Sequence, residues 1–312
     1  MDRGIDVVVI GDVNVDLIFL IDRFPSRGGN CIARRVEKSF GGVGGNRAAA
    51  LASLGLNVAL IGAVGEDRFG KEALEELKRY GVNIDHVKIL KDQLTGIMIV
   101  AVDLEGERTI IGSRESNSKL RISDEDLKLV EGVRHLHVAG YQMFNESPED
   151  ILGIIRHAHK LGISTSMDIE GIADLDLETL ESLKGILTYV IGNEDEAKGL
   201  LKAEAFGKEL AERLLKEFKA DAVAVKLGEK GCAVADRHHS YMVPGFKVEV
   251  VDTTGAGDAF DAGFIYGTLK GLSLIETARL ANAMGAFKCT KLGAKHYPTL
   301  AELKRSFPDI KI

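Results

Sequence analysis

The residues of this chain alternate between short apolar runs and longer amphipathic segments, and this alternation restricts the folds open to it. The apolar runs have the length of buried strands, and the segments between them show the apolar spacing that is typical of helices. Apolar strands separated by helices are typical of βαβ units around a parallel sheet, so the sequence predicts an α/β fold. We predict strands at 7–10, 58–63, 135–139, 164–168, 189–192 and 222–226, and helices at 46–54, 69–80, 150–161 and 208–218.

Two segments depart from this alternation. Residues 16–40 and 97–111 alternate apolar and polar side chains with no helix between them, as strands with one solvated face do. We predict that they form a small second sheet, a lid over one edge of the main domain. The length of 312 residues suits a single large α/β domain, residues 1–312, that carries such insertions.

Composition and charge narrow the function classes. The formal net charge of −7 argues against nucleic acid as the main partner, because binding to a phosphate backbone needs a basic surface. The N-terminal apolar run contains Asp12, Asn14 and Asp16, which excludes a membrane span there, and it lacks the signature of a signal peptide. The three cysteines match no metal-ligand spacing and no disulfide framework. We therefore expect a cytoplasmic protein.

The segment 252–258, Asp-Thr-Thr-Gly-Ala-Gly-Asp, has the composition of an anion-binding turn. Gly255, Ala256 and Gly257 precede an apolar helical run, so their N–H groups would lie at a helix N-terminus, where an anion is bound favourably. Asp258 could take a proton from a hydroxyl while these amides stabilise a phosphoryl group. A glycine-rich turn with an acidic residue near a helix start is also common without any such role, and the segment alone leaves both interpretations open.

A second glycine cluster, residues 41–45, precedes Asn46 at the start of a predicted helix. Glycine lets a ligand approach the backbone closely, but tight packing against the lid would require the same residues. Asn14 and Asp16 follow the first predicted strand, and ligands of open α/β sheets bind at the carboxyl ends of strands. An amide and a carboxylate there suit a substrate with several hydroxyl groups, although polar residues also occur at such places simply to form turns.

Two further motifs follow predicted strands. Asn193 and Glu196 are three residues apart, so both could face one ligand at a helix start, or the acid could simply complement the helix dipole. The glycines after Lys226, Gly228 and Gly231, could admit a nucleotide or form a plain hairpin turn.

Together these motifs resemble, in order and over essentially the whole chain, the ribokinase-like (PfkB) family of sugar and nucleoside kinases. The segments that carry the resemblance are 11–16, 24–29, 41–55, 62–70, 193–196 and 252–260. The resemblance implies a three-layer α/β/α core with a mostly parallel sheet and a small β lid. It also implies transfer of the γ-phosphoryl group of ATP, with Mg²⁺, to a hydroxyl of a small-molecule substrate.

The resemblance further implies roles for individual residues. Asp258 would be the general base. The anion hole would be formed by the amides of Gly255, Ala256 and Gly257. The substrate hydroxyls would be held by Asn14, Asp16, Gly42 and Asn46.

The remaining roles implied by the resemblance concern ATP and cations. Asn193 and Glu196 would organise phosphate and, indirectly, Mg²⁺. ATP would be bound at Lys226, Gly228, Gly231 and Asn282. A monovalent cation such as K⁺ would be held by Asp252 and Thr254 with carbonyl groups near Lys288, Lys291 and Gly293.

The chain departs from ribokinases where the substrate is bound. Val43 stands where ribokinases usually carry a lysine, and Gln142, with Glu146 nearby, stands near the expected acidic contact to ribose. Arg114, at the end of the second lid segment, could pair with the carboxylate of a sugar acid such as 2-keto-3-deoxygluconate, or it could be solvated.

The substrate therefore stays open between a sugar, a nucleoside and a sugar acid. An inactive sugar-binding regulatory protein with the same fold is a further alternative, which the intact Asp258 disfavours because a binding protein needs no base. Homodimers formed through the lid are common in families that resemble this chain, so a homodimer through the lid is one arrangement open to it; the sequence does not fix the oligomeric state.

Overall fold

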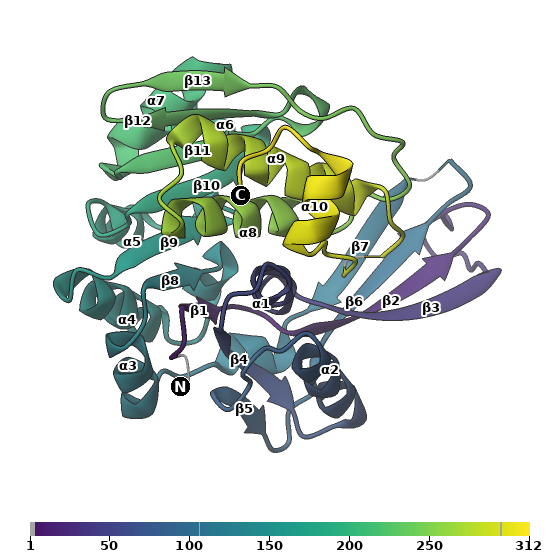
Figure 1. Cartoon of the computed structure of the whole chain (residues 1–312). Coiled ribbons are helices and arrows are strands. Elements are labelled where there is room, and N and C mark those ends of the chain that lie inside the picture. Colours follow the sequence, from purple (N-terminus) through teal and green to yellow (C-terminus); the bar gives the residue numbers. More distant parts are fainter. Residues whose placement is uncertain (1–3, 106, 294) are drawn as a thin grey trace.

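The computed structural model describes residues 4–105, 107–293 and 295–312. The strands of its main sheet are β1 Val7–Ile10, β4 Val58–Gly65, β5 Val87–Leu90, β8 His135–Val138, β9 Ser164–Asp168, β10 Tyr189–Asn193, β11 Ala222–Lys226, β12 Cys232–Asp236 and β13 Ser240–Val243. Their order is β13-β12-β11-β10-β9-β8-β1-β4-β5, from top to bottom in Figure 1. All neighbours from β11 to β5 pair in parallel, and β12 and β13 add an antiparallel edge. The predicted mostly parallel sheet is confirmed.

Helices cover both faces of this sheet, because successive residues of a strand point to opposite faces. Val7 and Val9 of β1 lie in one apolar core, with α1, α2 and α8–α10, and Val8 and Ile10 lie in the other, with α3–α7. The predicted three-layer α/β/α arrangement is confirmed (Figure 1). The helices are α1 Val43–Ser53, α2 Arg68–Arg79, α3 Asp124–Glu131, α4 Pro148–Lys160, α5 Leu177–Leu183, α6 Glu194–Leu201, α7 Gly207–Phe218, α8 Ala256–Leu269, α9 Leu274–Cys289 and α10 Leu300–Ser306, with short 3-10 turns η1 Glu115–Lys119, η2 Gly140–Phe144, η3 Ile172–Asp174 and η4 Gly228–Lys230.

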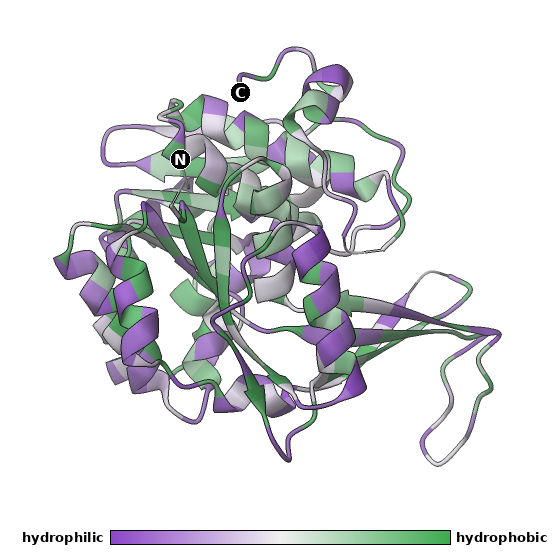
Figure 2. Ribbon diagram, turned by 60° about the horizontal axis from the view of Figure 1, so that its bottom comes forward, coloured by the Kyte–Doolittle hydropathy of each residue, from purple (hydrophilic) through white to green (hydrophobic). Residues whose placement is uncertain are grey.

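A second, four-stranded sheet forms the predicted lid. Its strands are β2 Asn14–Leu20, β3 Arg35–Gly41, β6 Gly96–Val102 and β7 Arg108–Ser113. Their order is β3-β2-β6-β7, with β2 and β6 parallel and the other pairs antiparallel. Figure 2 shows these strands projecting from the main body. Apolar side chains on the lid are exposed, among them Ile99 and Ile111, which are cross-strand partners; the homodimer through the lid stays a prediction.

The antiparallel edge of the main sheet was not predicted. From the sequence, residues 226–231 could be either a nucleotide-binding loop or a hairpin turn. In the structure they join β11 to β12 as a hairpin through η4. β12 and β13 are short strands that follow one another without a helix between them. The alternation of strands and helices in the sequence therefore does not predict them.

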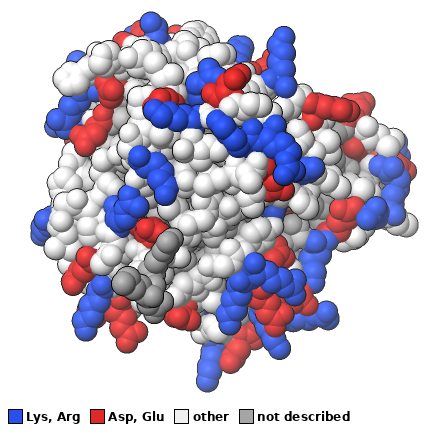
Figure 3. Space-filling model, viewed as in Figure 1, with Lys and Arg blue, Asp and Glu red and all other residues white. Residues whose placement is uncertain are grey.

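The visible surface mixes charges of both signs. Figure 3 shows Lys and Arg side chains interspersed with Asp and Glu side chains on the face seen in Figure 1. Among the described residues, no helix has both the length and the apolar character to cross a bilayer.

Close packing of backbone explains much of the first glycine cluster. A Cβ atom on Gly44 would lie 2.4 Å from the carbonyl carbon of Gly11, just after β1, and one on Gly42 would lie 2.4 Å from the carbonyl oxygen of Asp12. Gly42 also has a φ of 84°, a conformation that only glycine adopts without strain. The start of α1 is thereby held directly against the end of β1, and this contact brings Asn46 and its neighbour to the carboxyl edge of the sheet.

This contact predicts different outcomes for two adjacent glycines. Gly44→Ala should lower the free energy of unfolding by at least about 1–3 kcal/mol, because backbone cannot move aside as a flexible side chain would. Gly45→Ala is the control: its new Cβ would lie 3.6 Å from Leu77, an ordinary contact, and should be neutral or stabilise by about 0.5–1 kcal/mol. Urea denaturation of the two variants measures both values. Equal stability of the two would contradict the packing argument.

Candidate active site

Several buried charged side chains gather at the carboxyl edge of the main sheet. Asn46 and Arg47 come from the first turns of α1, and Asp258 and Asp261 from those of α8. Asp168 ends β9, next to them. Because the carboxyl ends of parallel strands meet at one edge, residues far apart in the sequence lie together here.

Arg47 is the centre of this cluster. Its side chain is 2% exposed, and its guanidinium pairs with Asp168, with Asp261 (Nη2–Oδ2 3.0 Å) and with Asp258 (Nε–Oδ1 3.3 Å). Burial works against its charge, but the surrounding carboxylates outweigh burial and raise the pKa of Arg47 above its ordinary value. A second cation, Lys226 at the end of β11, pairs with Asp261 (Nζ–Oδ1 3.0 Å). Two buried cations thus face three carboxylates.

Asp258 lies at the open side of the cluster. It is 8% exposed, whereas Asp168 is 1% exposed and Asp261 is fully buried. Burial raises the pKa of Asp258 to about 6, against the opposing effects of Arg47 and of a hydrogen bond donated by Asn46 Nδ2 to Oδ2 (2.9 Å). Near neutral pH this carboxylate is therefore ionised and still basic enough to accept a proton, as a general base must be.

Asn46 has an unused acceptor at the same place. Its Nδ2 binds Asp258, but its buried Oδ1 has no hydrogen-bond partner among the described residues. Buried polar atoms are almost always paired, so this oxygen indicates a position for a ligand donor such as a hydroxyl group.

Asp16 of β2 provides a second carboxylate facing this region. Its carboxylate lies against Gly41 of the neighbouring strand, where a Cβ would be only 2.4 Å from Oδ2. Burial raises the pKa of Asp16 to about 6; Lys295 opposes the shift and the charge of Asp258 adds to it. Asn14, by contrast, accepts a hydrogen bond from Asn117 Nδ2 (2.8 Å) and is tied into the lid's base.

The residues of the predicted anion-binding turn lie at the N-terminus of α8. Gly255 has a φ of 77° and precedes the first helical residue. Ala256 N already donates to Thr253 O (3.1 Å), whereas among the described residues the N–H groups of Gly255 and Gly257 reach no protein acceptor. Lys226 Nζ lies 3.5 Å from where a Gly257 Cβ would be, so a cation adjoins the turn. Free amides, a helix dipole and a lysine together suit a phosphate group.

Asn193 and Glu196 form a capping box at the start of α6. Asn193 Oδ1 accepts from Glu196 N (2.8 Å), and Glu196 Oε2 accepts from Asn193 N (2.8 Å). Burial raises the pKa of Glu196, and Lys226 opposes that shift. Both residues therefore stabilise the start of α6, whether or not they also bind a ligand. The described residues contain no group of three or more His, Cys, Asp or Glu side chains placed to hold a metal ion.

The other residues predicted to bind ATP lie around the β11–β12 hairpin. Gly231 packs against the end of β13, where a Cβ would lie 2.1 Å from Val243 O, while Gly228 has open space in front of it. Asn282 of α9 donates from Nδ2 to Val243 O (3.1 Å) and Pro244 O (3.2 Å). Asp252 and Thr254 lie just before α8, with Asp252 Oδ1 accepting from Thr254 N (2.8 Å). Their ligand roles stay predictions.

Arg114 is bound to groups inside the protein, and its side chain is 20% exposed. Its Nε and Nη2 each donate to the carboxylate of Asp12 at 2.9 Å, and Nη2 also donates to Asn145 Oδ1 (2.8 Å). Gln142, fully buried, donates to the same carboxylate of Asp12. The sequence did not indicate this pairing, because a sequence pattern does not tell which internal carboxylate an arginine will meet. A contact between Arg114 and a substrate stays a prediction.

Several residues of the site were missed from the sequence. Arg47 stands alone among alanines on a packing face, which is a signal for a buried, paired charge, and Asp168 ends a predicted strand. Glu170 follows Asp168; burial and the charge of Asp168 raise its pKa to about 8. Tyr141 and Phe144 form an exposed aromatic pair beside Arg114, with ring centroids 6.4 Å apart.

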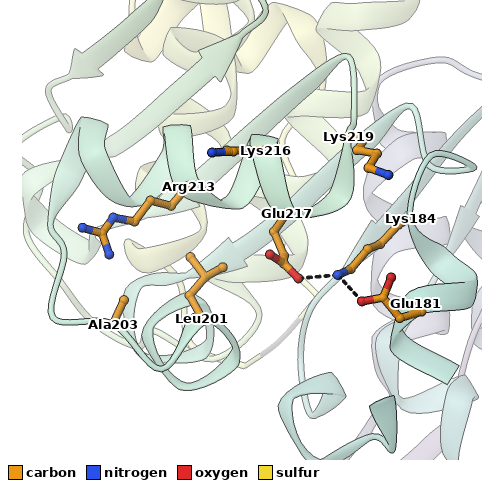
Figure 4. Close-up of a pocket in the computed structure, with 8 residues that line it drawn as sticks. All are labelled: Glu181, Lys184, Leu201, Ala203, Arg213, Lys216, Glu217 and Lys219. Atoms are coloured by element: carbon orange, nitrogen blue, oxygen red, sulfur yellow. Dashed lines mark hydrogen bonds and ion pairs between the residues drawn. The ribbon is translucent and has the colours of Figure 1, made fainter. Parts of the chain in front are cut away.

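A separate hollow of about 420 Å³ lies between α5, α6 and α7 (Figure 4). Part of its charged rim is paired: Lys184 contacts Glu181 (2.5 Å) and Glu217 (2.6 Å). None of the residues that line it is among those predicted to bind substrate or ATP.

Comparisons with known proteins identify the family and agree with the fold. The profile of the pfkB family carbohydrate kinases matches residues 5–300. An ATP-dependent ribose-1-phosphate kinase of Halopiger xanaduensis is 33% identical over 94% of this chain and 95% of its own length, and a ribokinase of Lactococcus lactis is 31% identical over 98% of both. The structure of Arabidopsis thaliana ribokinase complexed with ribose and ATP superposes with a TM-score of 0.85 at 28% identity, covering 97% of this chain and 98% of that one.

The Arg47 cluster predicts a pH-dependent loss of stability. Arg47→Met should lower the free energy of unfolding by about 3–5 kcal/mol at neutral pH, because it leaves buried carboxylates unpaired. Burial already raises the folded-state pKa values of Asp168 and Asp258, and without the guanidinium these two values rise further above the unfolded values. The folded state then binds more protons, so the loss relative to wild type should shrink as pH falls from about 8 to about 5.

Urea denaturation at several pH values measures this difference. Arg121→Met is the matched control, since it removes an exposed pair with Asp150 and should change stability by no more than about 1 kcal/mol at any pH. A loss for Arg47→Met that stays constant with pH would show that the carboxylates do not depend on the guanidinium.

Proposed function

This chain belongs to the pfkB family of carbohydrate kinases, and we propose that it transfers the γ-phosphoryl group of ATP to a sugar hydroxyl with Asp258 as the general base. The observation that carries the proposal is the position of Asp258. It is a buried carboxylate with a pKa of about 6, and it lies between an unpaired amide oxygen of Asn46 and the free N–H groups at the start of α8.

The sugar hydroxyl would be held between Asp16, Asn46 and Asp258. The unpaired Oδ1 of Asn46 would accept a hydrogen bond from one hydroxyl, and the carboxylates would accept hydrogen bonds from others. As the new O–P bond forms and the bond from the γ-phosphorus to the bridging oxygen of ATP breaks, the hydroxyl proton passes to Asp258. The released ADP carries away the charge of the broken bond.

The phosphate groups would be met by the N-terminus of α8 and by Lys226. The N–H groups of Gly255 and Gly257 are placed to stabilise the negative charge of the transferred group. Mg²⁺, which in such sites is bound largely by substrate phosphates and water, would neutralise phosphate charge near Glu196 and Glu170. The raised pKa of each of these acids reflects buried negative charge that a cation would relieve.

A sugar acid fits this site less well than a sugar. The arginine that could have paired with a substrate carboxylate is bound to Asp12. A carboxylate would instead approach Asp16 and Asp258, and like charges repel. We infer that the substrate is a ribose-type sugar, in keeping with the name of the ribokinase relative.

A nucleoside is the second candidate, and one observation favours it. Tyr141 and Phe144 are 38% and 39% exposed at the rim of the site, and Arg114 lies over the Tyr141 ring. The charges of Glu170 and Glu196, after burial, raise the pKa of Tyr141, which places this ring near the same acids. Exposed aromatic faces of this kind stack well on nucleobases.

A screen of ATP consumption tests the proposal. Ribose, ribose 1-phosphate, fructose 6-phosphate, nucleosides and sugar acids are offered with Mg-ATP, and wild type is compared with Asp258→Asn. We expect turnover on a ribose-type compound and a loss of about 10²–10⁴-fold in kcat for the variant, with substrate binding by calorimetry retained. Full turnover by the variant would remove Asp258 from the mechanism. Binding without turnover in wild type would favour the inactive regulatory protein.

The same screen separates the two substrate classes. If nucleosides are the substrates, Tyr141→Ala should raise KM for the nucleoside and leave KM for the free sugar unchanged, because only the nucleobase would reach the ring. If only sugars are substrates, the substitution should leave KM for the sugar unchanged, and neither protein should turn over a nucleoside.

A further inference from the structure

Lys288 lies with its side chain fully buried beside the segment that leads into the anion-binding turn. It belongs to the last turn of α9, and its Nζ donates to Asp252 O (3.2 Å) and to Lys291 O (3.1 Å). The first carbonyl lies three residues before Gly255, and the second follows the end of α9. The ammonium group thus joins the two segments through main-chain oxygens.

The surroundings of this ammonium group are those of a small cation site. Asp252 adds a carboxylate, which accepts from Thr254 N and from Gly293 N (both 2.8 Å) and so belongs to the same pair of segments. The backbone amides of Val251 and Asp252 both donate to Cys289 O, which holds the segments in register. The C-terminal end of a helix carries partial negative charge and favours a cation there.

A free monovalent cation does not fit at this place. Such an ion would need the carbonyl oxygens near residues 252 and 291, and the ammonium group of Lys288 already binds two of them. K⁺ and an ammonium group carry the same charge and hold oxygen neighbours at similar distances, so they compete for one position and repel each other if both are present. The fold family implies a monovalent cation here, and the residues of this chain disagree.

We propose that Lys288 supplies the positive charge that a monovalent cation would otherwise supply, so that the kinase works without one. The effect on catalysis rests on the proposed function, whereas the position of the ammonium group does not. The ammonium group fixes the carbonyl of Asp252 and offsets the negative charge of its carboxylate. It thereby positions the turn whose Gly255 and Gly257 amides receive the phosphoryl group; Lys288 is a positioning residue.

The test compares wild type, Lys288→Ala and Lys288→Met with either K⁺ or tetramethylammonium as the only monovalent cation. Thermal unfolding gives one readout, and ADP release measured by chromatography gives the other, so no coupling enzyme adds its own ion requirement. We expect wild type to show the same Tm and kcat in both salts. Lys288→Ala should lose about tenfold or more in kcat and several degrees in Tm in tetramethylammonium, and K⁺ should restore both because it enters the vacated position.

Two controls make the result specific. In Lys288→Met the longer apolar chain fills the position, so the losses should remain in K⁺. Lys216→Ala removes an exposed lysine of α7, far in the sequence from Lys288 and outside the cation site, so it should behave as wild type. A several-fold stimulation of wild type by K⁺ would overturn the proposal, as would losses in Lys288→Ala that K⁺ does not repair. The Tm readout decides the question even if no substrate is turned over, which separates this failure from failure of the proposed kinase activity.

Discussion

The buried guanidinium of Arg47 is the interaction on which the rest of the site depends. It joins the end of β9 to the first turns of α1 and α8 by pairing with Asp168, Asp258 and Asp261. Burying so many charges is unfavourable unless each is paired, and removal of one partner leaves the others uncompensated. The arrangement therefore fixes the relative positions of three elements that come from distant parts of the chain. An enzyme that works by positioning its substrates and stabilising charge in the transition state needs its groups held in fixed positions.

The same cluster sets the proton affinity of Asp258. Arg47 and the partly buried Lys226 lie among the carboxylates, and the least buried of the three acids is the one that faces the substrate region. Burial pushes the pKa of Asp258 up, while Arg47 and Asn46 limit the rise, and the balance lies at about 6. A lower value would make the carboxylate a weak base, and a much higher value would leave it protonated at neutral pH. The same charged groups thus stabilise the fold and set the pKa of Asp258.

Much of this architecture could be predicted from the sequence, because the signals are local. The spacing of apolar residues indicated the parallel sheet, and the segment 252–258 indicated an anion-binding turn at a helix start, which α8 confirms as a structure. The partners of Arg47 could not be predicted, since Asp168 is 121 positions away in the chain and nothing near Arg47 identifies it. For the same reason Arg114 was assigned to a ligand or to solvent and not to Asp12. Lys288 gave no signal at all, because its partners are main-chain oxygens, which every residue has.

The pKa of Asp258 tests the account most directly. Protein labelled with ¹³C at the aspartate carboxyl carbons can be titrated by NMR, and the resonance of Asp258 is the one that disappears in Asp258→Asn. The account predicts that this resonance titrates at about 6, well above the ordinary value of 3.8. A resonance that titrates at the ordinary value, or that stays protonated through neutral pH, would contradict the claim that the buried Arg47 cluster holds Asp258 ready as a base.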